Sequence, residues 1–204
     1  MKNFKNFKIF FKILFLFFWI GIIACGNIGS RVAKVAKQGF NMRVLGADKF
    51  PEYVPKEGRD NIDEIICTDN EADMDKFVSD CDFILNVAPL TSKTRGMYNK
   101  DFFAKMKETA YFMNIGRGPS VVEEDLIEAC KTRQIAGAYL DVFAQEPLPE
   151  NSPFWDVENI DMTFHSLHLT NDTLENFCST FNTNLERFLE GEELINIIDK
   201  EGGL

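Results

Sequence analysis

The sequence has little basic charge. Its 204 residues carry 22 Lys and Arg against 32 Asp and Glu, a formal net charge of −10. The basic residues are also unevenly placed, because residues 1–20 hold four lysines and no acid, which leaves −14 for the rest. A chain segment with this much negative charge repels nucleic-acid phosphates and anionic lipid. The composition therefore predicts that the protein binds no nucleic acid, and it argues against a membrane partner.

Histidine is scarce, and the cysteines form no ligand pattern. The chain has 2 His and 5 Cys, with no C-x-x-C pair and no His at the spacing of a zinc site. The odd number of thiols argues against a disulfide framework, and most lie in apolar runs, where a free thiol behaves as a small hydrophobe. We therefore expect no metal, a reducing compartment and a cytoplasmic location.

No unbroken apolar run reaches the ~20 residues that span a bilayer. Residues 1–18 are basic and apolar, and Ile22-Ile23-Ala24-Cys25 looks like a lipoprotein cleavage site. However, residues 19–29 have the pattern of a buried strand, a glycine turn and a helix, and cleavage before Cys25 would remove that strand. We favour an appended, loosely structured segment outside the fold for residues 1–18. A membrane anchor or leader and a packed helix are the alternatives.

From residue 19 onward, short apolar runs alternate with segments of helical periodicity, as in a parallel α/β sheet. We expect a Rossmann-type doubly wound parallel sheet, with strands covered on both faces. The expected strands are 19–24, 42–47, 64–67, 83–87, 110–114, 135–140 and 160–163. The expected helices are 27–39, 72–79, 99–106, 122–133 and 171–190.

The segment Gly26-Asn27-Ile28-Gly29 follows the first strand and opens a helix. Glycines let the backbone turn tightly and approach a pyrophosphate, whose charge the helix amino terminus stabilises. The motif is degenerate, because Ala24 stands where G-x-G-x-x-G has its first glycine.

Asp48 follows the second expected strand, 19 residues beyond Gly29. That spacing is close to the ~20 expected of a carboxylate that bonds the ribose hydroxyls, although a solvated turn residue is the plainer role. A carboxylate there repels a 2′-phosphate, so we expect NAD rather than NADP.

Four downstream blocks match a known family in order and spacing. They are Asn86-Val87-Ala88-Pro89-Leu90-Thr91-Ser92-Lys93-Thr94-Arg95-Gly96, Met113-Asn114-Ile115-Gly116-Arg117-Gly118, residues 136–148 and residues 159–165. From residue 19 to about 200 the chain resembles the D-isomer-specific 2-hydroxy acid dehydrogenases of the glyoxylate/hydroxypyruvate reductase type. The resemblance implies an NAD-dependent oxidoreductase acting on the CH–OH group of a D-2-hydroxy acid. It also implies a small 2-hydroxy or 2-oxo acid as substrate, and a homodimer.

The resemblance implies three catalytic residues. Arg117 would bind and polarise the substrate carboxylate and carbonyl, for which a planar guanidinium offers a bidentate fork. His165 would exchange a proton with the substrate hydroxyl, and Glu146 would bond that histidine and favour its charged form. A surface arginine and an ordinary polar histidine are the plainer roles, and His168 is the only other histidine.

The resemblance also assigns the cofactor contacts. Asp141 would meet the nicotinamide carboxamide, and the remaining contacts would be Gly26, Asn27, Ile28, Gly29, Asp48, Ala88, Ile115 and Gly116. The chain departs from the family at Phe164, where proline is usual, and at residues 166–168, where small residues are usual. We expect these changes to alter substrate access.

The family builds a second, substrate-binding domain from both chain ends. We expect an NAD-binding domain at residues 19–168 and, at residues 169–204, the C-terminal helix and tail of a substrate domain whose amino-terminal half this sequence does not contain. Because closure of the cleft excludes water during the reaction, a catalytically silent NAD-binding or interaction module is the second hypothesis. A membrane protein anchored by residues 1–18 is the third.

Overall fold

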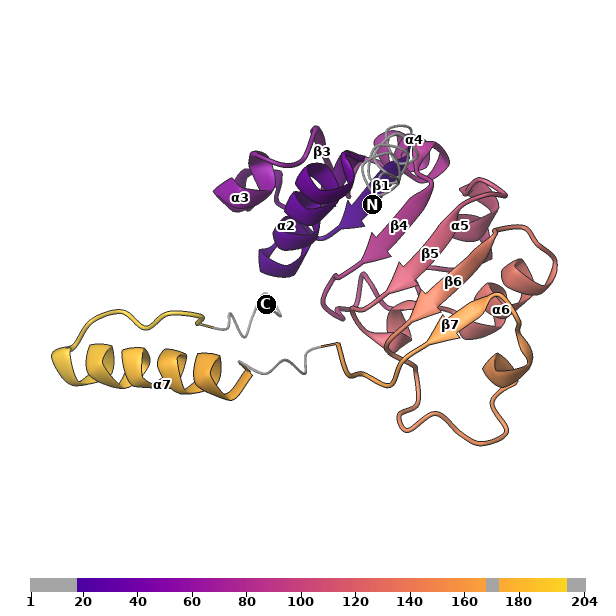
Figure 1. The fold of residues 1–204 in the computed structure, drawn as a ribbon. Helices are drawn as coiled ribbons and strands as arrows, with labels where there is room; N and C mark the ends of the chain where they lie inside the picture. Colours follow the sequence, from indigo (N-terminus) through magenta and orange to yellow (C-terminus); the bar gives the residue numbers. More distant parts are fainter. Residues whose placement is uncertain (1–17, 168–172, 198–204) are drawn as a thin grey trace, which may run out of the picture. The chain divides into compact units, whose positions relative to one another are not determined.

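The computed structural model describes residues 18–167 and 173–197 (Figure 1). The expectations for residues 1–17, for His168 and for a domain boundary after residue 168 lie outside these ranges. The chain divides into two compact units, Met1–Met162 and Thr163–Leu204. Each unit is described by itself below.

The first unit is built on a parallel sheet. Among the described residues it has seven strands, in the order β3-β2-β1-β4-β5-β6-β7. The strands are β1 (Trp19–Ile23), β2 (Arg43–Asp48), β3 (Glu64–Cys67), β4 (Phe83–Asn86), β5 (Tyr111–Asn114), β6 (Gly137–Leu140) and β7 (Ile160–Met162). The expected doubly wound parallel sheet is confirmed, and the strand order reverses between β1 and β4.

Most of the described helices fall where the periodicity predicts them. They are α2 (Asn27–Lys34), α3 (Lys56–Arg59), α4 (Glu71–Asp80), α5 (Lys100–Lys105), α6 (Glu123–Lys131) and α7 (Thr173–Glu190). The helix expected over 27–39 ends in a π-helical turn, Val35–Gly39, and the four-residue α3 was not expected. Short 3₁₀ turns at Pro51–Tyr53, Gly118–Ser120 and Pro153–Asp156 complete the elements.

Alternation along the strands divides the core between the two faces of the sheet. Ile22 and Val44 face one cluster, which contains Ala33 of α2. Leu45 and Ile84 face the larger cluster, which holds the apolar side chains of α4, α5 and α6. Figure 1 shows α2 and α3 on one side of the sheet and α4, α5 and α6 on the other.

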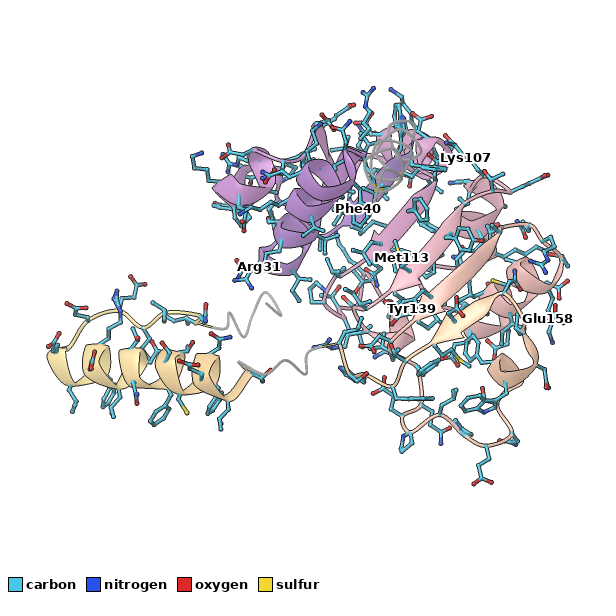
Figure 2. The ribbon with its side chains drawn as sticks, viewed as in Figure 1. Arg31, Phe40, Lys107, Met113, Tyr139 and Glu158 are labelled. Carbon is cyan, nitrogen blue, oxygen red and sulfur yellow. The ribbon has the colours of Figure 1, made fainter. Side chains whose placement is uncertain are left out.

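Coverage of both faces, which the apolar runs predict, is incomplete over β5 and β6. Phe112 and Ala138 are buried on the helix-covered face. On the other face Met113 and Tyr139, which pair in register, are only half-buried (Figure 2). Tyr111 of β5 is 44% exposed. The expected coverage of both faces therefore holds for β1 and β2, and it is wrong for these parts of β5 and β6.

The second unit contains α7, which has no buried residue. Apolar side chains recur along one stripe of this amphipathic helix and are exposed, namely Leu174, Phe177, Phe181, Leu185 and Phe188. Within the ranges that the structure describes, no helix has both the length and the apolar character needed to cross a bilayer.

Candidate functional site

The residues expected to hold a dinucleotide gather at the carboxyl ends of the strands. The glycine turn follows β1, Asp48 ends β2, Ala88 follows β4, Ile115 and Gly116 follow β5, and Asp141 follows β6. Because all these strands are parallel, their carboxyl ends meet at one edge of the sheet. Ligands of open α/β sheets bind at that edge, in the crevice where the strand order reverses.

The glycine turn leaves the start of α2 open. Gly26 precedes the helix, no side chain caps it, and Gly26, Asn27 and Ile28 are exposed. The first N–H groups of any helix lack intrahelical acceptors and attract anions. A Cβ placed on Gly26 would meet no atom within 4 Å, so the space in front of this backbone is free.

Gly29 has the opposite surroundings. A Cβ at Gly29 would collide with the backbone carbonyl oxygen of Ala24, so α2 lies directly against the end of β1. This close approach explains why position 29 requires glycine. The two glycines of the motif therefore serve different purposes: Gly26 leaves room, and Gly29 allows the packing.

Ala24, which replaces the first glycine of the motif, has a left-handed backbone with φ 73°. Its N–H donates to the Ala47 carbonyl at 2.8 Å, which fixes it at the end of the sheet. Left-handed φ costs a residue with a Cβ about 1 kcal/mol or more, whereas glycine adopts it freely.

Replacing Ala24 by glycine should therefore stabilise the protein, by about 0.5–1 kcal/mol in the free energy of unfolding. Urea denaturation of wild type and Ala24→Gly measures the difference. Ala33→Gly, at a fully buried position in α2, is the matched control and should destabilise. If Ala24→Gly and Ala33→Gly lower the free energy of unfolding equally, the backbone of Ala24 is not strained.

Asp48 is tied to the glycine turn. Its Oδ2 accepts the N–H of Cys25 at 2.7 Å, and its Oδ1 accepts the N–H of Phe50 at 2.9 Å. The side chain is only half-buried, and each carboxylate oxygen has a second lone pair. Asp48 therefore holds the turn after β1 and still offers acceptors at the site edge.

The ends of β4 and β5 form a second wall. A Cβ at Gly116 would lie 2.8 Å from the Ala88 carbonyl oxygen, so these two residues are in direct contact. The N–H of Ile115 donates to the Asn86 carbonyl at 3.1 Å. The structure thus brings together three of the expected cofactor contacts, Ala88, Ile115 and Gly116.

Arg117 follows this wall on an exposed loop. Its guanidinium Nη1 donates to the Gly116 carbonyl at 2.7 Å. A guanidinium has five N–H donors in a planar fork, so this single bond leaves it able to bind a carboxylate.

The Arg117 loop lies directly against the loop of Glu146. A Cβ at Gly118 would collide with the backbone carbonyl carbon and oxygen of Phe143. Within the second loop, Glu146 Oε1 accepts the Phe143 N–H at 2.9 Å. The structure therefore places the loops of Arg117 and Glu146 side by side, and the sequence alone does not indicate this role of Gly118.

Glu123 is a second residue whose role the sequence alone does not indicate. It opens α6, and its Oε1 accepts the Ala144 N–H at 2.8 Å, which anchors the Glu146 loop from the other side. Burial raises the pKa of Glu123 above its ordinary value, the bond to Ala144 opposes this rise, and neighbouring Glu124 adds to it. In the sequence, a carboxylate in the first turn of a helix is typical of any helix start and does not indicate the contact with Ala144.

The raised pKa predicts a pH-dependent effect of Glu123→Gln. A carboxyl whose pKa is higher in the folded state loses stability as the pH rises from its ordinary value, 4.5, through the folded value. Glutamine keeps an acceptor for Ala144 and has no charge, so the variant should gain in Tm over wild type at pH 7, and this gain should vanish at pH 4. Thermal denaturation at both pH values measures it, with Glu128→Gln, at an exposed position of the same helix, as control. A gain that is equal at both pH values would contradict the assignment.

The remaining predicted residues lie at different depths. Asp141 is buried, 3% exposed, and its N–H donates to the Asn114 carbonyl at 3.0 Å. His165 belongs to the second unit, is exposed and has a left-handed backbone with φ 50°. Strained backbone of this kind is enriched at functional sites. The position of His165 relative to Arg117 and Glu146 stays a prediction.

A separate hollow lies at the opposite edge of the sheet. Trp19, Arg43 and Glu64, the first residues of β1, β2 and β3, line it. None of the predicted site residues of the first unit lines it, so the hollow is distinct from the dinucleotide site.

The sequence comparisons agree with this geometry. Residues 19–166 match the family model of the D-isomer specific 2-hydroxyacid dehydrogenase NAD binding domain. The chain is 33% identical over 183 residues to glyoxylate/hydroxypyruvate reductase A of Photorhabdus laumondii, and 34% identical over 182 residues to glyoxylate/hydroxypyruvate reductase B of Escherichia fergusonii. Each alignment covers 89% of this chain, and 55% and 54% of those proteins. The chain thus spans about half the length of these relatives.

Solved structures share the fold. An NADPH-dependent glyoxylate/hydroxypyruvate reductase from Sinorhizobium meliloti, in complex with NADP and sulfate, matches 93% of this chain with a TM-score of 0.81 and 30% identity, over 58% of its own length. A probable 2-hydroxyacid dehydrogenase from Rhizobium etli, in complex with NADP, HEPES and L(+)-tartaric acid, matches 93% with a TM-score of 0.79 and 26% identity, over 58% of its length.

Proposed function

Since the chain belongs to the D-isomer specific 2-hydroxyacid dehydrogenase family, we propose that it holds a nicotinamide dinucleotide at the carboxyl edge of its sheet. We further propose that the protein interconverts a small D-2-hydroxy acid and its 2-oxo acid. The observation that carries the proposal is the open glycine turn, in which the uncapped start of α2 and the free space before Gly26 lie beside β1.

The residues present fit such a cofactor. The partial positive charge at the start of α2 attracts the negative charge of a pyrophosphate, and the missing Cβ of Gly26 leaves room for the pyrophosphate to approach the backbone. We assign the pyrophosphate to Gly26, Asn27, Ile28 and Gly29, the ribose to Asp48, the cleft wall to Ala88, Ile115 and Gly116, and the carboxamide to Asp141. When bound, the dinucleotide supplies or accepts the hydride.

The side chains of the chain then bind the substrate acid and transfer its proton. We assign Arg117 to the substrate carboxylate and carbonyl, where its fork fixes the orientation of the substrate and draws charge from the carbonyl. We assign His165 to the proton that the substrate oxygen gains or loses, and Glu146 to holding that imidazole in its charged form.

We propose NAD rather than NADP as the cofactor. Asp48 presents carboxylate oxygens where the adenosine ribose would lie, and a carboxylate repels the 2′-phosphate of NADP. The solved S. meliloti and R. etli relatives carry NADP, so this preference would distinguish the chain from them.

Cytoplasmic residence and homodimerisation are further proposals. Cys25, Cys81 and Cys130 are buried free thiols, and burial raises the pKa of each to about 12, which keeps them protonated and unreactive. Such thiols suit a reducing compartment. Light scattering of the purified protein tests the dimer.

Reduction of a 2-oxo acid tests the proposed function. NADH fluorescence reports cofactor binding, and loss of NADH absorbance with glyoxylate, hydroxypyruvate or pyruvate reports turnover. Arg117→Ala should lower kcat/KM by about a hundredfold, as expected for the loss of a bidentate charged contact, and leave NADH affinity nearly unchanged. Arg43→Ala, at the opposite edge of the sheet, is the matched control and should retain full activity.

Two outcomes would count against this function. If wild type binds NADH and reduces none of these acids faster than Arg117→Ala, the chain is an NAD-binding module without turnover. That outcome would support the second hypothesis. If NADH does not bind, the assignment of a dinucleotide site to the carboxyl edge of the sheet is wrong.

A further inference from the structure

Four buried polar side chains lie behind the site and have no role in the proposed reaction. Asn86 ends β4 and Asn114 ends β5, and the two residues pair in register. Tyr98 and Ser120 lie on the segments that follow these strands. All four are 0–1% exposed, in a region where apolar side chains are usual. We call them the Asn86 cluster.

The four side chains bond to one another. Asn86 Nδ2 donates to Asn114 Oδ1 at 2.8 Å and to Ser120 Oγ at 3.2 Å. The hydroxyl of Tyr98 donates to Asn86 Oδ1 at 2.8 Å. Burial raises the pKa of Tyr98 far above its usual value, so the phenol remains a donor throughout the physiological range.

The same side chains also bond to the backbone of the site. Asn86 Oδ1 accepts the Ala88 N–H at 2.9 Å, and Asn114 Oδ1 accepts the Gly116 N–H at 3.1 Å. The carbonyl of Arg117 accepts two side-chain bonds, from Ser120 Oγ at 2.6 Å and from Asn114 Nδ2 at 3.1 Å, and a backbone bond from the Ser120 N–H at 3.2 Å. One cluster therefore anchors the cofactor wall and the substrate-binding loop.

Such bonds are effective because water is excluded. In a buried site a polar group without a partner is costly, so the network resists any displacement of the backbone that would break one of its bonds. Arg117 itself is exposed, and within the described ranges its side chain bonds to the Gly116 carbonyl alone. The position of its guanidinium therefore depends on how firmly the loop backbone is held.

We propose that Tyr98, Asn86, Asn114 and Ser120 are positioning residues, which fix the backbone of residues 115–118 so that Gly116 faces the dinucleotide and Arg117 faces the acid. This inference rests on the proposed function. Within the cluster the roles divide, because Ser120 bonds the Arg117 carbonyl, whereas Tyr98 acts on the Asn86 oxygen that bonds Ala88.

Two variants that each remove one hydroxyl test the proposal, Ser120→Ala and Tyr98→Phe. Ser79→Ala, on an exposed turn of α4, and Tyr111→Phe, on the half-covered face of β5, are matched controls. Amide hydrogen exchange of residues 115–121 should be about fivefold faster in each cluster variant, which corresponds to one lost hydrogen bond, and should be unchanged in the controls.

Ligand binding supplies the second measurement. Oxamate, an unreactive analogue of a 2-oxo acid, is titrated into the NADH-loaded protein. Ser120→Ala should weaken oxamate about fivefold and change NADH affinity less than twofold. Tyr98→Phe should weaken NADH more than Ser120→Ala does, because it acts through Ala88.

Each outcome decides one of the two proposals. Unchanged exchange at residues 115–121, or faster exchange spread evenly over the whole sheet, overturns the positioning role. Unchanged oxamate affinity in Ser120→Ala also overturns it where wild type binds oxamate. If wild type binds neither NADH nor oxamate, the proposed function fails, and the exchange measurement still decides whether the cluster holds the loop.

Discussion

Replacing Gly118 by alanine should destabilise the protein by about 3 kcal/mol. The added methyl group would occupy the place of the Phe143 carbonyl carbon and oxygen, which are backbone atoms and cannot rotate away. The two loops must therefore separate, and Phe143, which is 4% exposed, would lose part of its packing against Phe154. Urea denaturation measures the loss.

The effect should be specific to this contact. Gly39→Ala is the matched control, since a Cβ there meets only a Val35 methyl carbon at 3.9 Å, an ordinary contact. We expect it to change stability by less than about 1 kcal/mol. A Gly118→Ala variant as stable as wild type would show that the Arg117 and Glu146 loops do not touch in solution.

Replacing Gly26 by alanine should reduce NADH affinity tenfold or more while leaving stability nearly unchanged. The methyl group meets no protein atom within 4 Å, and φ at Gly26 is −67°, outside the left-handed region that requires glycine. It would, however, fill the space through which a pyrophosphate approaches the helix start. Fluorescence titration with NADH measures affinity, and thermal denaturation measures stability.

Gly39→Ala again serves as control, because it lies on the same helical segment and away from the turn. Its NADH affinity should equal that of wild type. If Gly26→Ala binds NADH as tightly as Gly39→Ala, the dinucleotide does not lie over the turn.

The strands could be predicted because they are apolar runs bounded by turn residues. β3 has the predicted bounds, Glu64–Cys67. More than half of the ends of the other strands differ from the predicted ends, by one or two residues. Coverage could not be predicted in the same way. Tyr111 and Met113 are as apolar as residues on a buried face, and only the packing of helices decides which face is covered.

The candidate site divides in the same way. Gly26, Gly29 and Asp48 could be found from spacing, because a turn between consecutive elements is local in sequence. The contacts of Gly118 with Phe143 and of Glu123 with Ala144 join residues more than twenty positions apart, and no local signal marks them. The sequence marks Asn86 and Asn114 only as parts of the family blocks, and nothing in it indicates that the two residues are buried together.

Calorimetric titration of the intact chain with NADH and with NADPH tests the central claim most directly. The open turn and Asp48 predict that NADH binds at one site per chain and more tightly than NADPH. Tighter binding of NADPH than of NADH would contradict the role of Asp48, but it would still support a dinucleotide site at the carboxyl edge of the sheet. Absence of heat and of fluorescence change with both dinucleotides would contradict the assignment of the carboxyl edge as a dinucleotide site.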